Sequence, residues 1–313
     1  AQATDLGGTP CALAPIALGS RNWLPIVVCM LQELSQWLIG DTAVGGVAPP
    51  LSHGPLEFSE AELLLATRRL DPGRRLGAES RGAIYRGNLR DWPLVAVKVL
   101  ELGDEVATRS CFAQEVAFLS QLRHPNLVLL LGWGAGQARR FLVYEFRRGE
   151  DLAQRLRSSS VVAPCGGRAF GWAERLSVAA DAARGLAYMH GTSVVHGNVK
   201  ASNIFIEKDG TAKVIDFGIL GVVDHKGRAS LPGRELDGSS SLAALKRADV
   251  RAFAAVVFEL LTNVTDAPAH QLRPQLDVNA FRREQVLQAL DSQAGWPPLL
   301  AQELAVLAET LAG

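Results

Sequence analysis

The first residues in this chain that point to chemistry are two glycines, Gly77 and Gly82, which are followed by the apolar residues 83–85. Glycine has no Cβ, so a hairpin built on this pair lets the backbone pass close to phosphate groups. Such a turn is a weak signal by itself, because glycine turns are common. It gains weight from the apolar run at 95–98, which ends in Lys98.

Lys98 belongs to a run that the hydrophobic pattern places toward the core. A buried ammonium group is costly unless an opposite charge pairs with it. Glu115, within a predicted helix at 109–122, is the candidate partner. Taken alone, the two residues are equally well explained as ordinary surface charges, and both interpretations stay open at this point.

The composition describes a folded, charge-balanced chain of 313 residues. Lysine plus arginine number 32, as do aspartate plus glutamate, which argues against electrostatic binding to nucleic acid or to an anionic membrane. A hydrophobic content of 48% excludes a disordered chain and predicts a buried core. The 4 cysteines lie far apart, so neither a disulfide framework nor a zinc site is predicted, and a reducing compartment fits best.

The elements that must position these groups are predicted as strands first and helices afterwards. Strands are expected at 83–85, 94–100 and 141–144, and a long helix at 172–190. Ser59 and Glu62 have the spacing of a capping box and predict the start of an earlier helix. Residues 157–171, rich in serine and glycine, are expected to form an exposed loop. Strands followed by helices, without a βα repeat, predict an α+β fold with a β-rich lobe before a helical lobe.

Residues 1–57 are predicted to be an extension that precedes the main domain. Residues 24–39 carry an interrupted amphipathic leucine stripe, which predicts a short helix packed on the main domain. A membrane-surface helix, a partner-docking helix and the remnant of a juxtamembrane region remain alternatives. No stretch reaches the roughly 18 apolar residues of a membrane span, and residues 41–54 have the glycine and proline content of a linker. The chain begins at Ala1 and not at methionine, so an upstream portion is expected.

The later motifs together resemble those of the protein kinase family. Residues 196–203 are similar to the catalytic loop of that family. The two predicted strands on either side of the Lys-Asp-Gly turn at 208–210 are similar to the hairpin that follows this loop. Residues 216–218 are similar to the metal-binding triplet. The likeness covers about residues 58–263, with further matches at 122–127, 142–146, 183–190, 249–253 and 259–262. In detail it is similar to plant receptor-like kinases and to interleukin-receptor-associated kinases. The His-Gly-Asn loop is similar to that of a leucine-rich-repeat receptor subgroup often classed as inactive.

This resemblance implies a bilobal fold, with an N-lobe at 58–146 and a C-lobe at 147–313 that stops before the family's final helices. It also implies ATP and magnesium as cofactors. Lys98 would hold the α- and β-phosphates and be fixed by Glu115, while Lys200 would lie near the γ-phosphate. Gly77 and Gly82 would form the phosphate loop, and Ile84, Ala96 and Phe205 would sandwich the adenine. Tyr144 would stand at the back of the pocket, and Glu145 and Phe146 would offer backbone hydrogen bonds. Asn203 and Asp216 would bind magnesium.

The position of the catalytic base departs from the family pattern. Asn198 stands where the family has an aspartate, and a carboxamide is nearly isosteric but cannot serve as a useful base. Losing a positioned base typically costs about 10²–10⁴ in rate. Three further departures point the same way: Glu79 replaces the middle glycine of the phosphate loop, Gly197 replaces an arginine, and residues 235–237 replace an Ala-Pro-Glu triplet.

These observations predict a pseudokinase, either one that binds ATP and magnesium or one with a vacant nucleotide site, that acts as a scaffold or allosteric partner of receptor-type kinases or other signalling proteins. A low-activity serine/threonine kinase that transfers the γ-phosphate of ATP remains the alternative, and a decayed chain that folds poorly is a third possibility. No nucleic-acid partner is expected. A cytoplasmic location is expected, and the segment at 24–39 is compatible with the inner face of the plasma membrane.

Overall fold

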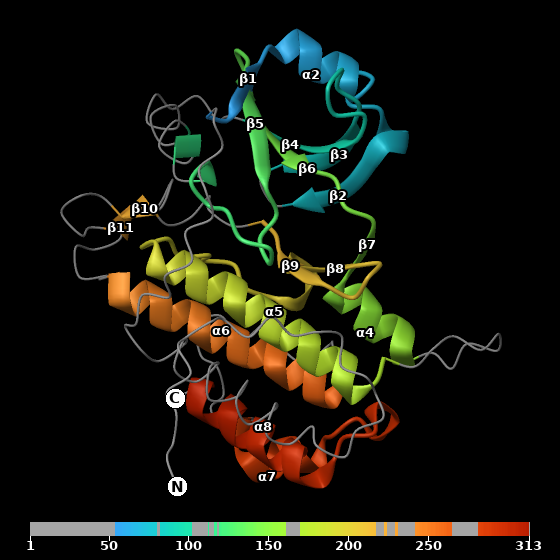
Figure 1. The fold of residues 1–313 in the computed structure, drawn as a ribbon, viewed down its shortest axis with the longest axis vertical. Helices are drawn as coiled ribbons and strands as arrows, with labels where there is room; N and C mark the ends of the chain where they lie inside the picture. The colour runs from blue at the N-terminus through green and yellow to red at the C-terminus, as the bar shows by residue number, and fades with distance from the viewer. Residues whose placement is uncertain are drawn as a thin grey trace, which may run out of the picture.

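The computed structural model describes residues 54–79, 82–101, 112, 116–117, 119–160, 170–216, 222–223, 229–230, 242–264 and 281–312. They form a β-rich lobe followed by a helical lobe, so the predicted α+β fold is confirmed (Figure 1). Several predictions lie outside the described residues: the segment at 24–39, nearly all of the linker at 41–54, Glu115 and the triplet at 235–237. Within the described part of the chain, no helix is long and apolar enough to cross a membrane.

The first lobe is built on a six-stranded sheet with the order β1-β5-β6-β4-β3-β2. Its neighbours are antiparallel except for β1, which runs parallel to β5. The predicted strands at 83–85, 94–100 and 141–144 are confirmed as β3, β4 and β6. The bounds are β1 (Leu56–Phe58), β2 (Arg75–Glu79), β3 (Gly82–Gly87), β4 (Val95–Glu101), β5 (Leu130–Ala135) and β6 (Arg139–Glu145).

Helix α2 (Glu60–Ala66) begins where the capping box predicts. The Glu62 N–H donates to Ser59 Oγ at 3.2 Å, and the Glu62 carboxylate accepts from the Ser59 N–H at 3.3 Å. Leu63 of this helix is fully buried among the valines of β4 and the inner residues of β6. The preceding strand β1 can lie against β5 because Gly132 has no side chain: a Cβ there would be 2.4 Å from the Leu56 carbonyl oxygen.

The helical lobe places its two longest helices side by side, with the small β7-β8-β9 sheet on one side and α7 and α8 on the other (Figure 1). The predicted helix at 172–190 and the predicted hairpin around 208–210 are both confirmed. The helices are α4 (Leu152–Ser160), α5 (Trp172–Gly191), α6 (Leu242–Thr262), α7 (Arg283–Gln288) and α8 (Pro298–Ala312), with short 3-10 turns η1 (Pro72–Arg74), η2 (Ala201–Asn203) and η5 (Ser292–Ala294). The strands are β7 (Gly149–Asp151), β8 (Ile204–Glu207), β9 (Ala212–Val214), β10 (Val222–Val223) and β11 (Ala229–Ser230).

The predicted loop at 157–171 is wrong over residues 157–160, which continue helix α4. Leu156 is fully buried and anchors the helix, and the hydroxyls of Ser158 and Ser159 donate to the Arg155 carbonyl. Serine can bond to the backbone of the preceding turn, so these residues extend a helix that packing has already started. Phe170, at the other end of the segment, is buried, and residues 161–169 lie outside the described part.

The predicted helix at 109–122 is described only in part. Phe112, Val116, Ala117 and Leu119 have helical conformation. The Phe112 ring meets Trp133 of β5 edge-on, with centroids 6.1 Å apart and planes at 66°. Phe112 therefore packs against the sheet that carries Lys98.

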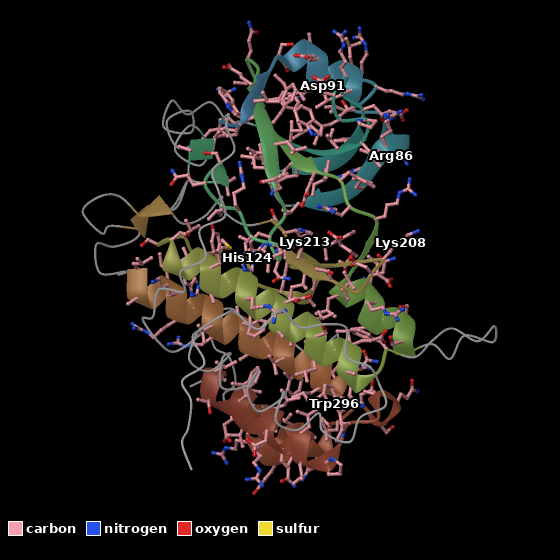
Figure 2. The ribbon with its side chains drawn as sticks, viewed as in Figure 1. Arg86, Asp91, His124, Lys208, Lys213 and Trp296 are labelled. Carbon is pink, nitrogen blue, oxygen red and sulfur yellow. The ribbon has the colours of Figure 1, made fainter. Side chains whose placement is uncertain are left out.

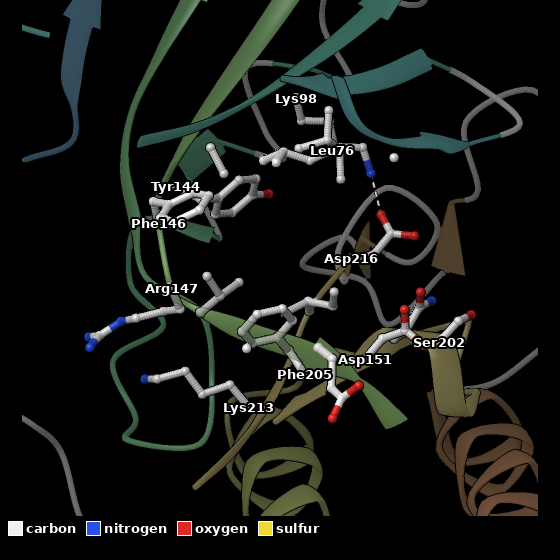
Figure 3. Close-up of a pocket in the computed structure, with 18 of the residues that line it drawn as sticks. Leu76, Lys98, Tyr144, Phe146, Arg147, Asp151, Ser202, Phe205, Lys213 and Asp216 are labelled. Atoms are coloured by element: carbon white, nitrogen blue, oxygen red, sulfur yellow. Dashed lines mark hydrogen bonds and ion pairs between the residues drawn. The ribbon is translucent and has the colours of Figure 1, made fainter. Parts of the chain in front are cut away.

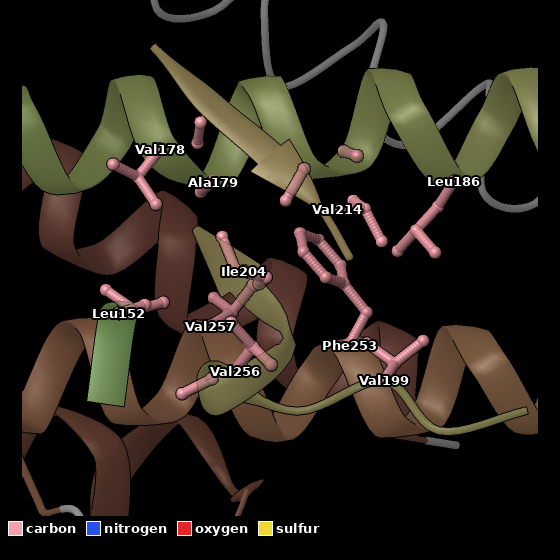
Figure 4. Packing of buried hydrophobic residues seen from close by; sticks show 14 of the residues in the cluster. Leu152, Val178, Ala179, Leu186, Val199, Ile204, Val214, Phe253, Val256 and Val257 are labelled. Carbon is pink, nitrogen blue, oxygen red and sulfur yellow. The ribbon is translucent and has the colours of Figure 1, made fainter. Parts of the chain in front are cut away.

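An apolar core joins α5, α6 and the β8-β9 hairpin (Figure 4). Phe253 of α6 lies among Leu186 of α5, Val214 of β9 and Val199, and all four are buried. Full burial of each such side chain contributes about 1.5–3 kcal/mol. The polar loop at 196–203 connects α5 to β8, so the elements at both of its ends belong to this buried core.

Candidate functional site

A cavity of about 910 Å³ lies between the two lobes (Figure 3). This volume is within the range of about 300–1,000 Å³ typical of small-molecule and cofactor sites. Most of the predicted site residues line it: Gly77, Ile84, Ala96, Lys98, Tyr144, Glu145, Phe146, Asn198, Lys200, Asn203, Phe205 and Asp216. Gly82 is described in β3 but does not line the cavity, and Glu115 lies outside the described residues.

Apolar side chains from both lobes line one part of the cavity, which we call the slot. Ile84 and Ala96 come from β3 and β4, and Phe205 of β8 faces them from the helical lobe. Two further wall residues, Leu76 and Val128, were missed by the sequence reasoning. Leu76 is half exposed on β2. The only sequence signal for it is that it is apolar and directly precedes Gly77. Apolar walls from both lobes suit an aromatic ring.

The linking segment, residues 145–148, is fixed from behind by ionic contacts. The Glu145 carboxylate accepts from Arg147 at 2.6 Å and from the Leu129 N–H at 3.2 Å, and it lies 3.4 Å from Lys213 Nζ. Lys213 also donates to the Pro125 carbonyl at 2.7 Å. Arg147 and Lys213 stand in none of the motifs described above, so neither is predicted from the sequence to lie at the site. The contact between Glu145 of β6 and Lys213 of β9 joins the two lobes.

Lys98 is buried, with 3% of its surface exposed, as the hydrophobic pattern predicts. Its ammonium group forms an ion pair with the Asp216 carboxylate (Figure 3). Asp216 has a φ of 58°, a left-handed conformation that is rare outside glycine and clusters at functional sites. The two lobes thus meet at an opposite-charge contact inside the cavity.

Asn198 contacts the same carboxylate from the other side. Its Nδ2 donates to Asp216 Oδ2 at 3.3 Å, while its backbone carbonyl accepts from Asn203 Nδ2 at 2.8 Å. The bond from Asn203 Nδ2 to the Asn198 carbonyl orients the Asn203 amide. The Oδ1 atom of Asn203 is then the acceptor that this side chain can offer to a ligand. Lys200 lies in the same loop, half buried, and lines the cavity.

A buried aspartate on α6 holds this loop in place. Asp249, 2% exposed, accepts from the backbone N–H groups of His196 and Gly197 at 2.7 and 2.8 Å. His190 of α5 contacts the same carboxylate through Nε2 at 3.0 Å. Gly197 has a φ of 73°, which a residue with a side chain rarely adopts. Asp249 belongs to the motif at 249–253, which by itself predicts none of these contacts.

His196 is neutral in this arrangement. Burial lowers the pKa of its ring below the ordinary value of 6.5. Its Nδ1 accepts from the Asn198 N–H at 3.2 Å, so the proton is on Nε2, which donates to the Ile215 carbonyl at 3.1 Å. The histidine therefore ties the loop to the residue that precedes Asp216.

Two oxygen-bearing side chains in the cavity suit a divalent cation. The Asn203 amide oxygen and the Asp216 carboxylate are hard donors, and Mg²⁺ commonly takes one or two such protein ligands and completes its shell with water and phosphate. The donor set therefore fits magnesium. Among the described residues, no group of three or more His, Cys, Asp or Glu side chains gathers to form a larger cage.

Comparison with known proteins agrees with this geometry. Residues 70–297 match the family described as protein tyrosine and serine/threonine kinase. A probable LRR receptor-like serine/threonine-protein kinase of Arabidopsis thaliana is 34% identical over 222 residues, which cover 67% of this chain and 23% of the relative. The leucine-rich repeat receptor protein kinase MSL1 of Oryza sativa subsp. japonica is 32% identical over 247 residues, covering 73% and 17%. The serine/threonine-protein kinase PBL13 of Arabidopsis thaliana is 34% identical over 225 residues, covering 66% and 44%. The matched region spans less than half the length of each of these relatives.

Proposed function

Because this chain belongs to the protein tyrosine and serine/threonine kinase family and is related to plant receptor-like serine/threonine kinases, we propose that it is a nucleotide-binding pseudokinase. The observation that carries the proposal is Asn198, an amide at the position where the family pattern requires a base. An amide cannot take the proton of an incoming hydroxyl group. The domain then acts through contacts with other proteins and not through catalysis.

The nucleotide half of the proposal rests on the cavity. ATP would place its adenine between Ala96 and Phe205, beside the backbone of the linking segment, and its phosphates near Lys98 and Lys200. Magnesium, when bound, neutralises phosphate charge, and Asn203 and Asp216 are the residues that would hold it. Lys98 already faces Asp216 across the cavity, which supports this assignment.

The loss of catalysis follows from what the Asn198 side chain does. A catalytic aspartate presents a carboxylate to the substrate hydroxyl, whereas the Asn198 Nδ2 donates to Asp216. Loss of a positioned general base costs about 10²–10⁴ in rate. We expect phosphorylation of protein substrates to be slower than that of an intact kinase by this factor.

The second half of the proposal concerns partners. The relatives are named as receptor-like kinases and as a leucine-rich repeat receptor kinase. We propose that this chain serves as a scaffold or allosteric partner for an active receptor-type kinase or another signalling protein. Its proposed location is the cytoplasm, including the inner face of the plasma membrane.

The proposal is tested by measuring binding and catalysis on the same protein. Titration with ATP and magnesium should raise the melting temperature, since a ligand at 100 times its Kd stabilises the folded state by about 2.7 kcal/mol. The Lys98→Ala variant should lose this shift. Phosphorylation at the speed of an intact kinase, abolished by Lys98→Ala, would refute the pseudokinase assignment.

A low-activity serine/threonine kinase is the second candidate. It is favoured by Lys200, which lines the cavity in the same loop as Asn198. Phosphoryl transfer depends mostly on positioning and charge neutralisation, so a slow reaction needs no base. A weak phosphorylation signal that disappears in Lys98→Ala and rises by about 10²–10⁴ in Asn198→Asp would support this candidate.

A further inference from the structure

The cavity as a whole carries more positive than negative charge. Among the described residues that line it, the charged side chains are the six cations Lys98, Arg147, Arg148, Lys200, Lys208 and Lys213 and the four carboxylates Glu145, Glu150, Asp151 and Asp216. His196 also lines the cavity, and its ring adds no charge because Nδ1 accepts from the Asn198 N–H. Asn198 carries no charge. A polyphosphate entering the cavity therefore meets a net positive charge from the described residues that line it.

Both oxygens of Asp216 are already matched by protein donors. Oδ1 pairs with the Lys98 ammonium group, and Oδ2 accepts from Asn198 Nδ2 at 3.3 Å. The carboxylate is only 12% exposed, so these donors replace most of the water that an open carboxylate would have. When Lys98 turns toward a phosphate, the Asn198 amide stays beside Asp216.

An aspartate at position 198 would behave differently. It would place a carboxylate oxygen where the Asn198 amide nitrogen now lies, 3.3 Å from Asp216 Oδ2. Two carboxylates at this separation repel, and a cation between them or a proton on one of them relieves the repulsion. The Asn198 amide removes the need for such a cation or proton, since it offers a hydrogen-bond donor in place of a second negative charge.

Building on the proposed function, we propose that the cavity binds a nucleoside di- or triphosphate as its metal-free anion, and that Asn198 is the positioning residue that makes a divalent cation unnecessary. The phosphates contact Lys98 and Lys200 directly, while Asn198 keeps the Asp216 carboxylate hydrogen-bonded. Magnesium remains compatible with Asn203 and Asp216 but adds little affinity.

Isothermal titration calorimetry of the full chain with ATP tests the proposal, once in excess EDTA and once in excess magnesium chloride. For the native chain, we expect the two Kd values to agree within about threefold. For Asn198→Asp, we expect EDTA to weaken binding at least about tenfold relative to magnesium. The melting temperature without ligand shows whether each variant is folded.

Asn88→Asp is the matched control. Asn88 is exposed on the first lobe, accepts from Arg74 at 2.9 Å and does not line the cavity, so an aspartate there adds the same charge outside the cavity lining. It should bind ATP equally with and without magnesium, like the native chain. Native binding that requires magnesium would overturn this inference and leave the nucleotide-binding proposal standing. A metal-independent Asn198→Asp would overturn the role of Asn198, and no binding in either buffer would overturn both proposals.

Discussion

The N–H of Gly197, in the loop after α5, donates to the Asp249 carboxylate of α6 at 2.8 Å. The two residues are far apart in the sequence, and their contact fixes the loop that carries Asn198. The same carboxylate accepts from the His196 N–H at 2.7 Å. The buried Asp249 carboxylate thus holds the 196–203 loop in place, and mutations at either end of this contact can test its role.

Replacement of the anchor, Asp249→Asn, should destabilise the protein by about 3 kcal/mol, the scale of losing hydrogen bonds to a buried charged group. An amide can accept from one loop N–H, but its own NH₂ group then faces the other donors. Urea unfolding measures the loss. Asp91→Asn, at an exposed aspartate on the first lobe (Figure 2), should leave the unfolding midpoint unchanged. Equal midpoints for the two variants would show that Asp249 is not an anchor.

Gly197→Ala tests the backbone of the same loop. Gly197 has a φ of 73°, and an L-residue in the left-handed region costs about 1–2 kcal/mol. We expect a loss of that size in the free energy of unfolding. Gly191→Ala is the control, because a Cβ at Gly191 would meet nothing within 4 Å and the residue ends helix α5. A native-like stability for Gly197→Ala would contradict the observed loop conformation.

Glu259 on α6 should make stability depend on pH. Burial raises the pKa of this carboxyl to about 7 from 4.5. The unfolded chain releases the proton near pH 4.5 and the folded chain near pH 7, so the folded state binds more protons in this window. Stability therefore falls as the pH rises from 4.5 to about 7 and levels off above it.

Glu259→Gln should remove this decrease of folding stability with rising pH. The variant should gain up to about 3 kcal/mol over the native chain across the same pH window, as measured by urea unfolding at several pH values. Glu284→Gln, at an exposed position in α7, should give a curve parallel to that of the native chain. Parallel curves for both variants would mean that Glu259 is ionised in the folded protein at low pH.

Lys213→Met tests the contacts behind the linking segment. The change leaves the carbonyls of Pro125 and Leu127 without the ammonium donor at 2.7 and 3.3 Å, at a cost of about 1–3 kcal/mol. Lys208→Met is the control, since Lys208 lies exposed in the turn of the same hairpin (Figure 2). Thermal melting should separate the two variants, and identical melting curves would show that Lys213 does not join the lobes.

The local elements were predictable because their causes are local. The spacing of Ser59 and Glu62 predicts a helix start, and hydrophobic periodicity predicts β4, β6 and the helix at 172–190. The loop predicted at 157–160 was wrong for the opposite reason. Burial of Leu156, which depends on the packing of the whole lobe, overrides the loop preference of the serines.

The sequence by itself therefore determined the family, the α+β order of elements and most of the residues that line the cavity. The tertiary structure decided which of those residues touch: Asp216 with Lys98 and Asn198, Asp249 with the 196–203 loop, and Lys213 with Glu145. Motifs and periodicity reflect residues that are close along the chain. These contacts join residues from separate elements, and only the packing of the two lobes and of their common core brings such groups within hydrogen-bond distance.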